Sequence, residues 1–140
     1  MNRFRSLLVL AFVLLVVVAA GGAGRGSADR HFLGLWEGVD VNDGSKRTIS
    51  IADRDTDGTF EVAARDSFWT LCEGDRGLEL ATGRAGDDGV LQTEGVVTCF
   101  ENDIEIPVRQ TYEYSRSADT LFATPVGTSL SPITLHRVSD

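Results

Sequence analysis

The acidic segment 53–61 has carboxylates at a spacing that resembles a known metal-binding loop. Positions 1, 3 and 5 of a calcium-binding loop template are carboxylates here: Asp53, Asp55 and Asp57. Gly58 stands at position 6, where such loops turn sharply around Ca²⁺. Position 12, which should hold a bidentate glutamate, is Ala64, and the flanking residues alternate like strands rather than helices. We therefore interpret the segment as an acidic hairpin turn, with weak calcium binding as the alternative, and predict no cofactor.

The histidines and hydroxyl residues do not form a catalytic pattern. Nucleophilic catalysis needs a serine or cysteine beside a histidine that an acid orients. The chain has two histidines, His31 and His136, and no G-x-S-x-G motif. His136 has the opposite parity to Ile133 and Leu135, so it should face outward, and the two histidines meet none of the usual zinc spacings. We predict that the protein is not an enzyme.

The two cysteines, Cys72 and Cys99, are predicted to form a disulfide. An even number of cysteines behind an export signal is typical of proteins that mature in an oxidising compartment. Closing a loop of this length should stabilise the fold by about 3 to 4 kcal/mol on the chain-entropy model. The alternative is a reactive thiol pair, but such pairs are usually spaced as C-x-x-C.

The elements that position these residues are predicted to be β-strands. Apolar residues alternate with polar ones, as in the pairs Ile49 and Ile51 and Leu78 and Leu80, each expected to share a buried face. In the run from Ile104 to Tyr114, only Gln110 interrupts the inner apolar row. The expected strands are Leu35–Val41, Arg47–Ala52, Thr59–Arg65, a short Phe68–Cys72, Leu78–Gly83, Val90–Cys99, Ile104–Ser115, Thr120–Thr124 and Ile133–Val138.

Turn signals rich in glycine, aspartate and asparagine separate these strands at short intervals. They indicate consecutive hairpins without a helical crossover, and hence an antiparallel sheet. A sheet this long should close on itself to hide its edges. We therefore predict one all-β domain over residues 29–140, an antiparallel meander of eight or nine strands closing into a small up-and-down barrel.

The first and last strands carry the residues Gly34, Trp36 and Arg137. In a closed meander the last strand pairs with the first, which would place the guanidinium of Arg137 over the indole of Trp36 at one end of the barrel. This pattern resembles the calycin superfamily of lipocalins, avidins and fatty-acid-binding proteins, in which a G-x-W packs against a basic residue of the last strand. The opening from Gly34 to Asp40 also resembles small exported bacterial β-proteins with G-x-W-x-G-x-D. An ordinary core tryptophan near a surface arginine is the alternative.

A set of aromatic residues could line a ligand cavity or fill the barrel interior. Barrels of about eight strands can do either, and for so short a domain we slightly favour a filled core. The candidates for ligand-lining residues are Phe60, Phe68, Trp69, Tyr112, Tyr114 and Phe122.

The N-terminal residues 1–28 have the order of a signal peptide. Arg3 and Arg5 precede the uncharged apolar run Leu7–Ala20, and small residues follow. If this segment is cleaved, the protein is secreted or otherwise extracytoplasmic, which is what we predict. Membrane attachment is expected only if the segment stays uncleaved. Cleavage removes three arginines and no acid, which leaves ten basic against 21 acidic side chains and moves the net charge from −8 to −11. Such an acidic surface argues against nucleic acid as a partner.

Two functions of different classes agree with these observations. The first is a non-catalytic binding module that holds a small apolar or amphipathic ligand between the strands. The second is a protein-interaction module such as an inhibitor of a secreted protease, because small bacterial inhibitors of this kind resemble the chain. They act through an N-terminal segment, here Ser27–Leu33.

Overall fold

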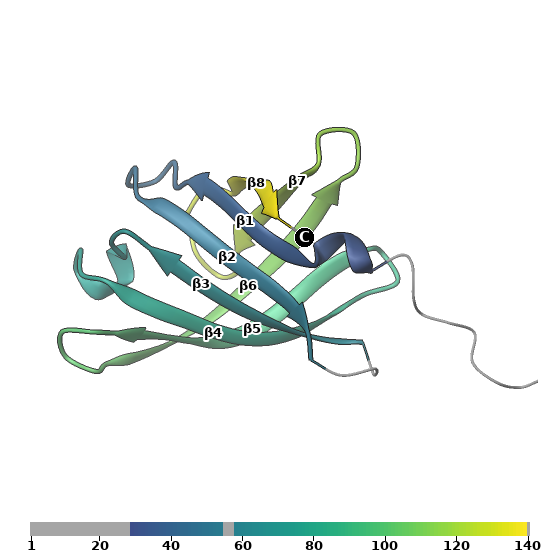
Figure 1. The fold of residues 1–140 in the computed structure, drawn as a ribbon. Helices are drawn as coiled ribbons and strands as arrows, with labels where there is room; N and C mark the ends of the chain where they lie inside the picture. The colour runs from purple at the N-terminus through teal and green to yellow at the C-terminus, as the bar shows by residue number, and fades with distance from the viewer. Residues whose placement is uncertain (1–28, 55–57, 140) are drawn as a thin grey trace, which may run out of the picture.

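The computed structural model describes residues 29–54 and 58–139, which form an eight-stranded closed antiparallel barrel (Figure 1). The predicted signal peptide, Asp55 and Asp57 lie outside the described residues. The elements in chain order are η1 (Arg30–Phe32), β1 (Gly34–Val39), β2 (Lys46–Asp53), β3 (Thr59–Asp66), η2 (Thr70–Cys72), β4 (Gly77–Ala85), β5 (Val90–Cys99), β6 (Glu105–Ser115), β7 (Thr120–Pro125) and β8 (Ile133–Ser139).

Each strand pairs with its neighbours in sequence, and β8 pairs back onto β1, as the meander predicts. The closing register sets Trp36 opposite Arg137, with a shift between Leu35 and Trp36. Every strand therefore has a partner on both sides over at least part of its length, and the sheet has no edge strand. The predicted all-β fold and its closure are confirmed.

The segment predicted as a ninth strand, Phe68–Cys72, is not a strand. It ends in the 3₁₀ turn η2, after which Glu73 takes a left-handed conformation with φ of 57°. Here the chain turns inward so that Cys72 can reach Cys99, to which it is joined by a disulfide with the Cα atoms 5.5 Å apart. A disulfide is typical of proteins that fold outside the reducing cytoplasm.

The parity predicted for Leu78 and Leu80 is wrong. Leu80 is 55% exposed, whereas Glu79 is fully buried and Ala81 nearly so. The disulfide explains the inversion, because Cys99 must point inward to meet Cys72 and its register partner on β4 is Gly77. Side chains alternate along a strand, so an inward Gly77 puts Glu79 and Ala81 on the inner face as well.

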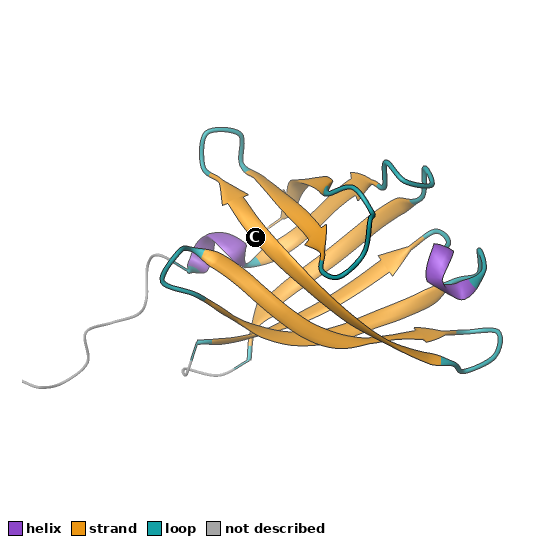
Figure 2. Cartoon of the chain, turned by 180° about the vertical axis from the view of Figure 1, so that it is seen from behind, coloured by secondary structure: helices purple, strands orange, loops and turns teal. Residues whose placement is uncertain are grey.

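The barrel has two unlike ends. The loops 40–45, 67–76, 100–104 and 126–132 lie at one end, which we call the mouth, and η1 lies at the other, which we call the closed end. Figure 2 shows the two short helices η1 and η2 at opposite ends of the barrel. Within the described part of the chain, no helix is both long and apolar enough to span a membrane.

Candidate functional site

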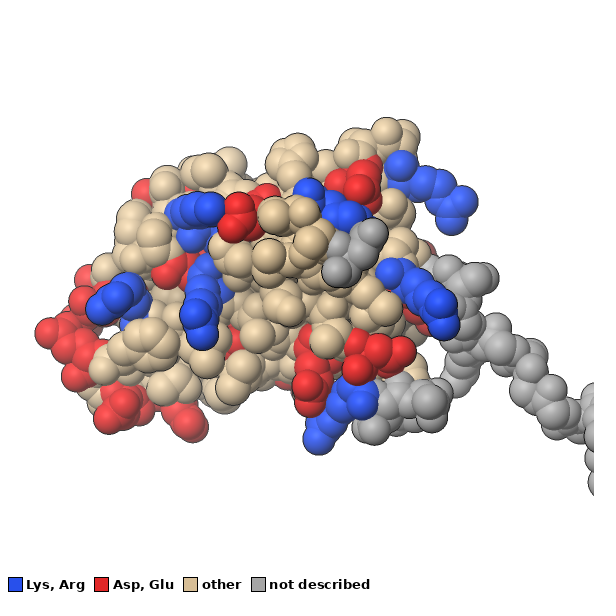
Figure 3. Space-filling view, viewed as in Figure 1, with Lys and Arg blue, Asp and Glu red and all other residues tan. Residues whose placement is uncertain are grey.

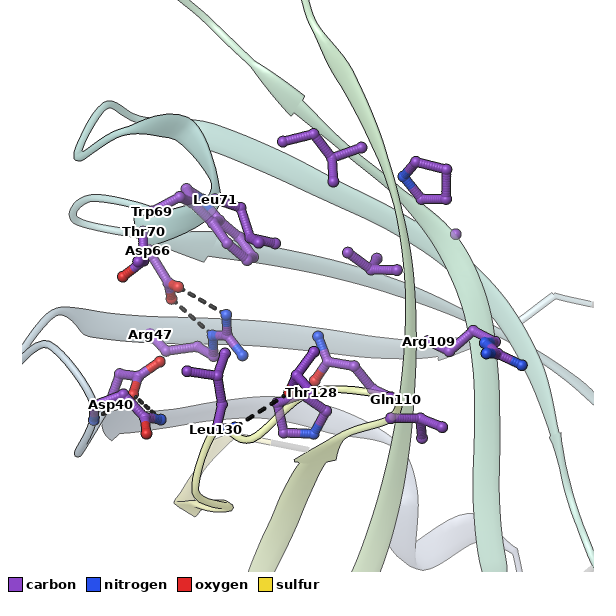
Figure 4. A pocket seen from close by; sticks show the side chains of 18 of the residues that line it. Asp40, Arg47, Asp66, Trp69, Thr70, Leu71, Arg109, Gln110, Thr128 and Leu130 are labelled. Atoms are coloured by element: carbon purple, nitrogen blue, oxygen red, sulfur yellow. Dashed lines mark hydrogen bonds and ion pairs between the residues drawn. The ribbon is translucent and has the colours of Figure 1, made fainter.

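A cavity of about 680 Å³ opens at the mouth of the barrel. This volume is within the range of pockets that hold small molecules. Figure 4 shows side chains from opposite walls pointing into it. Its lining comes from the β1–β2 loop, the mouth ends of β2, β3 and β7, η2 and the residue before it, strands β5 and β6, and the β7–β8 loop. Buried side chains fill much of the barrel interior, as we slightly favour from the sequence, and the cavity lies at the mouth end.

One wall of the cavity opens where β6 loses its partner. The register between β6 and β7 begins only at Gln110 and Pro125, although β6 starts five residues earlier at Glu105. Val126 adds one further backbone hydrogen bond to the Arg109 carbonyl, at 2.9 Å, before the chain leaves the sheet. The β7–β8 loop follows, and its Leu130 faces the cavity (Figure 4).

The rim of the cavity includes exposed apolar side chains beside polar residues such as Asn42 and Thr70. Leu71, Val126 and Leu130 are 37 to 41% exposed at its edge, and the half-buried Ile106 and Val108 lie further in on β6. Exposed apolar side chains gathered around a hollow are more informative than the same residues scattered singly. The rim can therefore contact the apolar part of a ligand.

The inner side of the cavity contains a buried ion pair between Arg47 and Asp66. Arg47 Nε and Nη2 each donate to the Asp66 carboxylate at 2.8 Å, and both side chains are at most 5% exposed. The two residues are register partners on β2 and β3, and Figure 4 shows them side by side. The guanidinium also lies 4.7 Å from the centre of the Trp69 ring. Burial raises the pKa of Asp66, and the hydrogen bonds from Arg47 oppose that rise.

A second buried pair lies beside it. Gln110 Nε2 donates to Glu79 Oε2 at 2.7 Å, across the inward-facing Gly95 of the intervening strand β5. A Cβ at Gly95 would collide with the Leu80 carbonyl oxygen, so the backbones approach closely here. Burial raises the pKa of Glu79 to about 7, with Arg47 lowering it and Asp66 raising it.

Several polar atoms in this interior have no hydrogen-bond partner. They include Glu79 Oε1, Gln110 Oε1 and the Trp69 indole nitrogen. Buried polar atoms are rarely left without partners in folded proteins, so these atoms are candidates for contact with a ligand. Gln110 lines the cavity directly, whereas Glu79 lies behind it. Burial also raises the pKa of Tyr112 well above its usual value, so that hydroxyl stays neutral.

The closed end is sealed by Trp36, Arg137 and η1. Arg137 Cζ lies 4.1 Å from the centre of the Trp36 ring. The same guanidinium donates to the backbone carbonyls of His31, at 2.8 Å, and Leu33, and its Nε donates to Asp119 at 3.1 Å. The indole nitrogen of the fully buried Trp36 donates to the Phe32 carbonyl at 2.9 Å. Gly34, with φ of 120°, lets the chain turn from η1 into β1.

The aromatic residues predicted to line a cavity are divided among different places. Trp69 lines it. Phe60 and Tyr112 belong instead to the buried core, and Tyr114 stacks on His31 at the closed end, with ring centres 4.6 Å apart. Phe68 is half-buried, and Phe122 points outward with 40% exposure because it has the opposite parity to Leu121 and Ala123.

The calcium candidate falls largely outside the described residues. Asp53 is the exposed last residue of β2, and nothing is described of Asp55 or Asp57. Among the residues that the structure does describe, no three or more histidine, cysteine or acidic side chains are placed to hold a metal ion.

The sequence interpretation missed Arg47, Asp66 and Glu79. A signal for two of them was present: Arg47 shares the parity of Ile49 and Ile51, and Asp66 continues the inward row of β3. A charged residue in an inward row is a candidate for a buried polar site. Glu79 was hidden by the inverted parity of β4.

Comparisons with known protein families, with curated proteins and with solved structures each gave no match, so the functional argument depends on the geometry of this chain.

Proposed function

We propose that the protein is an exported, non-catalytic binding module with a calycin-like barrel that holds a small amphipathic ligand in its mouth cavity. The observation that carries the proposal is a 680 Å³ hollow with exposed apolar side chains at its rim and buried polar atoms that lack partners. Natural ligand sites combine these features: apolar walls supply the contact area and a few convergent polar groups fix the orientation.

The calycin-like assignment is supported by the contacts of the closed end. Gly34, Trp36 and Arg137 occupy there the places that the resemblance implies, on the first and last strands of a meander barrel. With that end sealed, a ligand would enter through the mouth, where the β6–β7 gap also opens.

The protease-inhibitor alternative is less well supported. Its active segment would be Ser27–Leu33, yet residues 30–33 pack at the closed end and their carbonyls accept hydrogen bonds from Trp36 and Arg137. A segment held in this way would have to leave the barrel before it could enter a protease.

Titration with the neutral fluorophore N-phenyl-1-naphthylamine tests the proposal. We expect saturable binding with one molecule per chain. Val108→Trp, which fills the cavity from β6, should weaken binding about tenfold or more. Phe122→Trp places the same ring on the outer face and serves as the matched control, with binding unchanged.

Two outcomes would overturn the proposal. One is the absence of saturable fluorophore binding, and the other is equal weakening by both tryptophan variants. A stable complex with a secreted protease, in the absence of fluorophore binding, would favour the inhibitor instead.

A further inference from the structure

The charges around the cavity are predominantly acidic. Four carboxylates and two guanidinium groups line it: Asp40, Asp43, Asp66 and Glu94 with Arg47 and Arg109. Arg47 is matched by Asp66 in the ion pair, and Arg109 is the register partner of Glu94 on β5. Asp40 and Asp43 remain on the lining, and Glu79 lies behind Gln110. Figure 3 shows acidic side chains gathering at the left end of the view, toward the mouth loops.

Of the two guanidinium groups, Arg109 belongs to the exposed row of β6, so an anionic head group inside the cavity would find little to bind it. Arg47 is the buried cation of the cavity, but its Nε and Nη2 are already committed to Asp66 and its face lies against Trp69. A carboxylate would also have to approach Glu79 without a new positive charge to compensate, and like charges in a poorly solvated site repel strongly.

The buried atoms that lack partners favour a donor instead. Gln110 is 5% exposed and lines the cavity, and its amide nitrogen is used by Glu79 Oε2. Its Oε1 is therefore left as an acceptor without a donor, and Glu79 Oε1 behind it becomes a second acceptor when that carboxyl is ionised. A ligand that supplies N–H donors would satisfy these atoms, and a positive charge on it would offset the acidic surroundings.

Resting on the proposed binding function, we propose that the ligand is an amphipathic amine. Its protonated nitrogen donates to Gln110 Oε1 with Glu79 behind it, and its alkyl or aryl tail lies across Ile106, Val108 and Leu130 toward the mouth. The tail contacts are apolar and unselective, so the class of the ligand is decided by its head group.

The affinity for such an amine should depend on pH. The groups that face Glu79 are Arg47 from β2, Asp66 from β3, and Gln110 and Tyr112 from β6. Because burial raises the pKa of Glu79 to about 7, its negative charge develops as the pH rises through that value. An alkylamine stays protonated to about pH 10, as lysine does, so amine affinity should increase between about pH 5.5 and about pH 8.5.

Displacement of bound N-phenyl-1-naphthylamine by decylamine, decanol and decanoate, each below its micellar concentration, tests the inference. The three probes share one tail and differ in the head. We expect decylamine to bind about tenfold or more tightly than decanoate, with decanol between them. Glu79→Gln should remove most of that preference and its pH dependence, whereas Glu113→Gln, on the outer face of β6, should leave both unchanged.

The outcomes separate this inference from the proposed function. Decanoate binding as tightly as decylamine, or a preference that Glu79→Gln does not alter, would overturn the amine assignment and leave the binding function standing. An amine affinity in the unaltered protein that stays constant from about pH 5.5 to about pH 8.5 would also overturn it, without the need for a variant. Failure of the fluorophore itself to bind would overturn the binding function.

Discussion

Glu79 is the residue whose ionisation should affect stability most. Its carboxyl has a pKa of about 7 in the folded chain, raised by burial from an unfolded value near 4.5. The folded state therefore holds a proton that the unfolded state releases, and stability falls as the pH rises from about 4.5 to 7. Above that range the buried negative charge remains a cost.

We expect Glu79→Gln to make the protein more stable than the unaltered chain by about 2 to 3 kcal/mol at pH 8, and to change it little at pH 4.5. Urea unfolding at the two pH values measures the difference. Glu113→Gln, on the exposed face of β6, should show no such pH dependence. An equal effect of Glu79→Gln at both pH values would contradict a raised pKa.

Replacing either Arg47 or Asp66 alone should lower the free energy of unfolding far more than replacing both. Arg47→Met leaves a buried carboxylate without its partner and should lower the free energy of unfolding by about 3 to 5 kcal/mol, as should Asp66→Leu. The double variant removes both charges and should recover most of that loss. Chemical denaturation of the four proteins in a double-mutant cycle gives the coupling; additive effects would show that the pair does not act as a unit.

At the scale of single strands, the disulfide determines which face of β4 is buried. We expect Leu80→Glu to change the free energy of unfolding by no more than about 0.5 kcal/mol, because Leu80 is exposed. Ala81→Glu places the same carboxylate inside the barrel and should cost several kcal/mol. Thermal unfolding of the two neighbouring variants compares them directly. If Leu80→Glu instead cost more than Ala81→Glu, Leu80 would face the interior, as the sequence predicts.

The strands and turns could largely be predicted from the sequence, because alternation and glycine-rich turns are local signals. The face of β4 could not, since Leu78 and Leu80 are a stronger apolar signal than Gly77 and Ala81. The side toward which Cys99 points is set by a contact distant in sequence. The same holds for the site: Gln110 stood out as the break in an apolar row, but its partner Glu79 lies two strands away.

At the scale of the whole molecule, Arg137 ties the end of the chain to its beginning. Its guanidinium covers Trp36 and donates to two carbonyls of the segment before β1. Arg137→Ala would remove both hydrogen bonds and the contact over Trp36, so we expect a loss of about 2 to 3 kcal/mol. Arg137→Lys should recover only part of it, because an ammonium cannot reproduce the planar fork.

Equilibrium unfolding monitored by tryptophan fluorescence measures both Arg137 variants. Thr134→Ala, at an exposed position of the same strand, is the matched control and should have little effect. If Arg137→Ala were as mild as the control, the closed end would owe its stability to Trp36 and the apolar core alone.

The pairing of β8 with β1 also has a consequence for the order of folding. Beside this seam a side-chain hydrogen bond joins Arg137 to His31, 106 positions away, whereas every other ladder connects strands that are adjacent in sequence. Contacts at long sequence separation carry the largest entropic cost of loop closure, so hairpins should form early and the seam late. Contacts that form after the transition state influence unfolding more than folding. We therefore expect Arg137 to slow the unfolding of the barrel more than it speeds its folding.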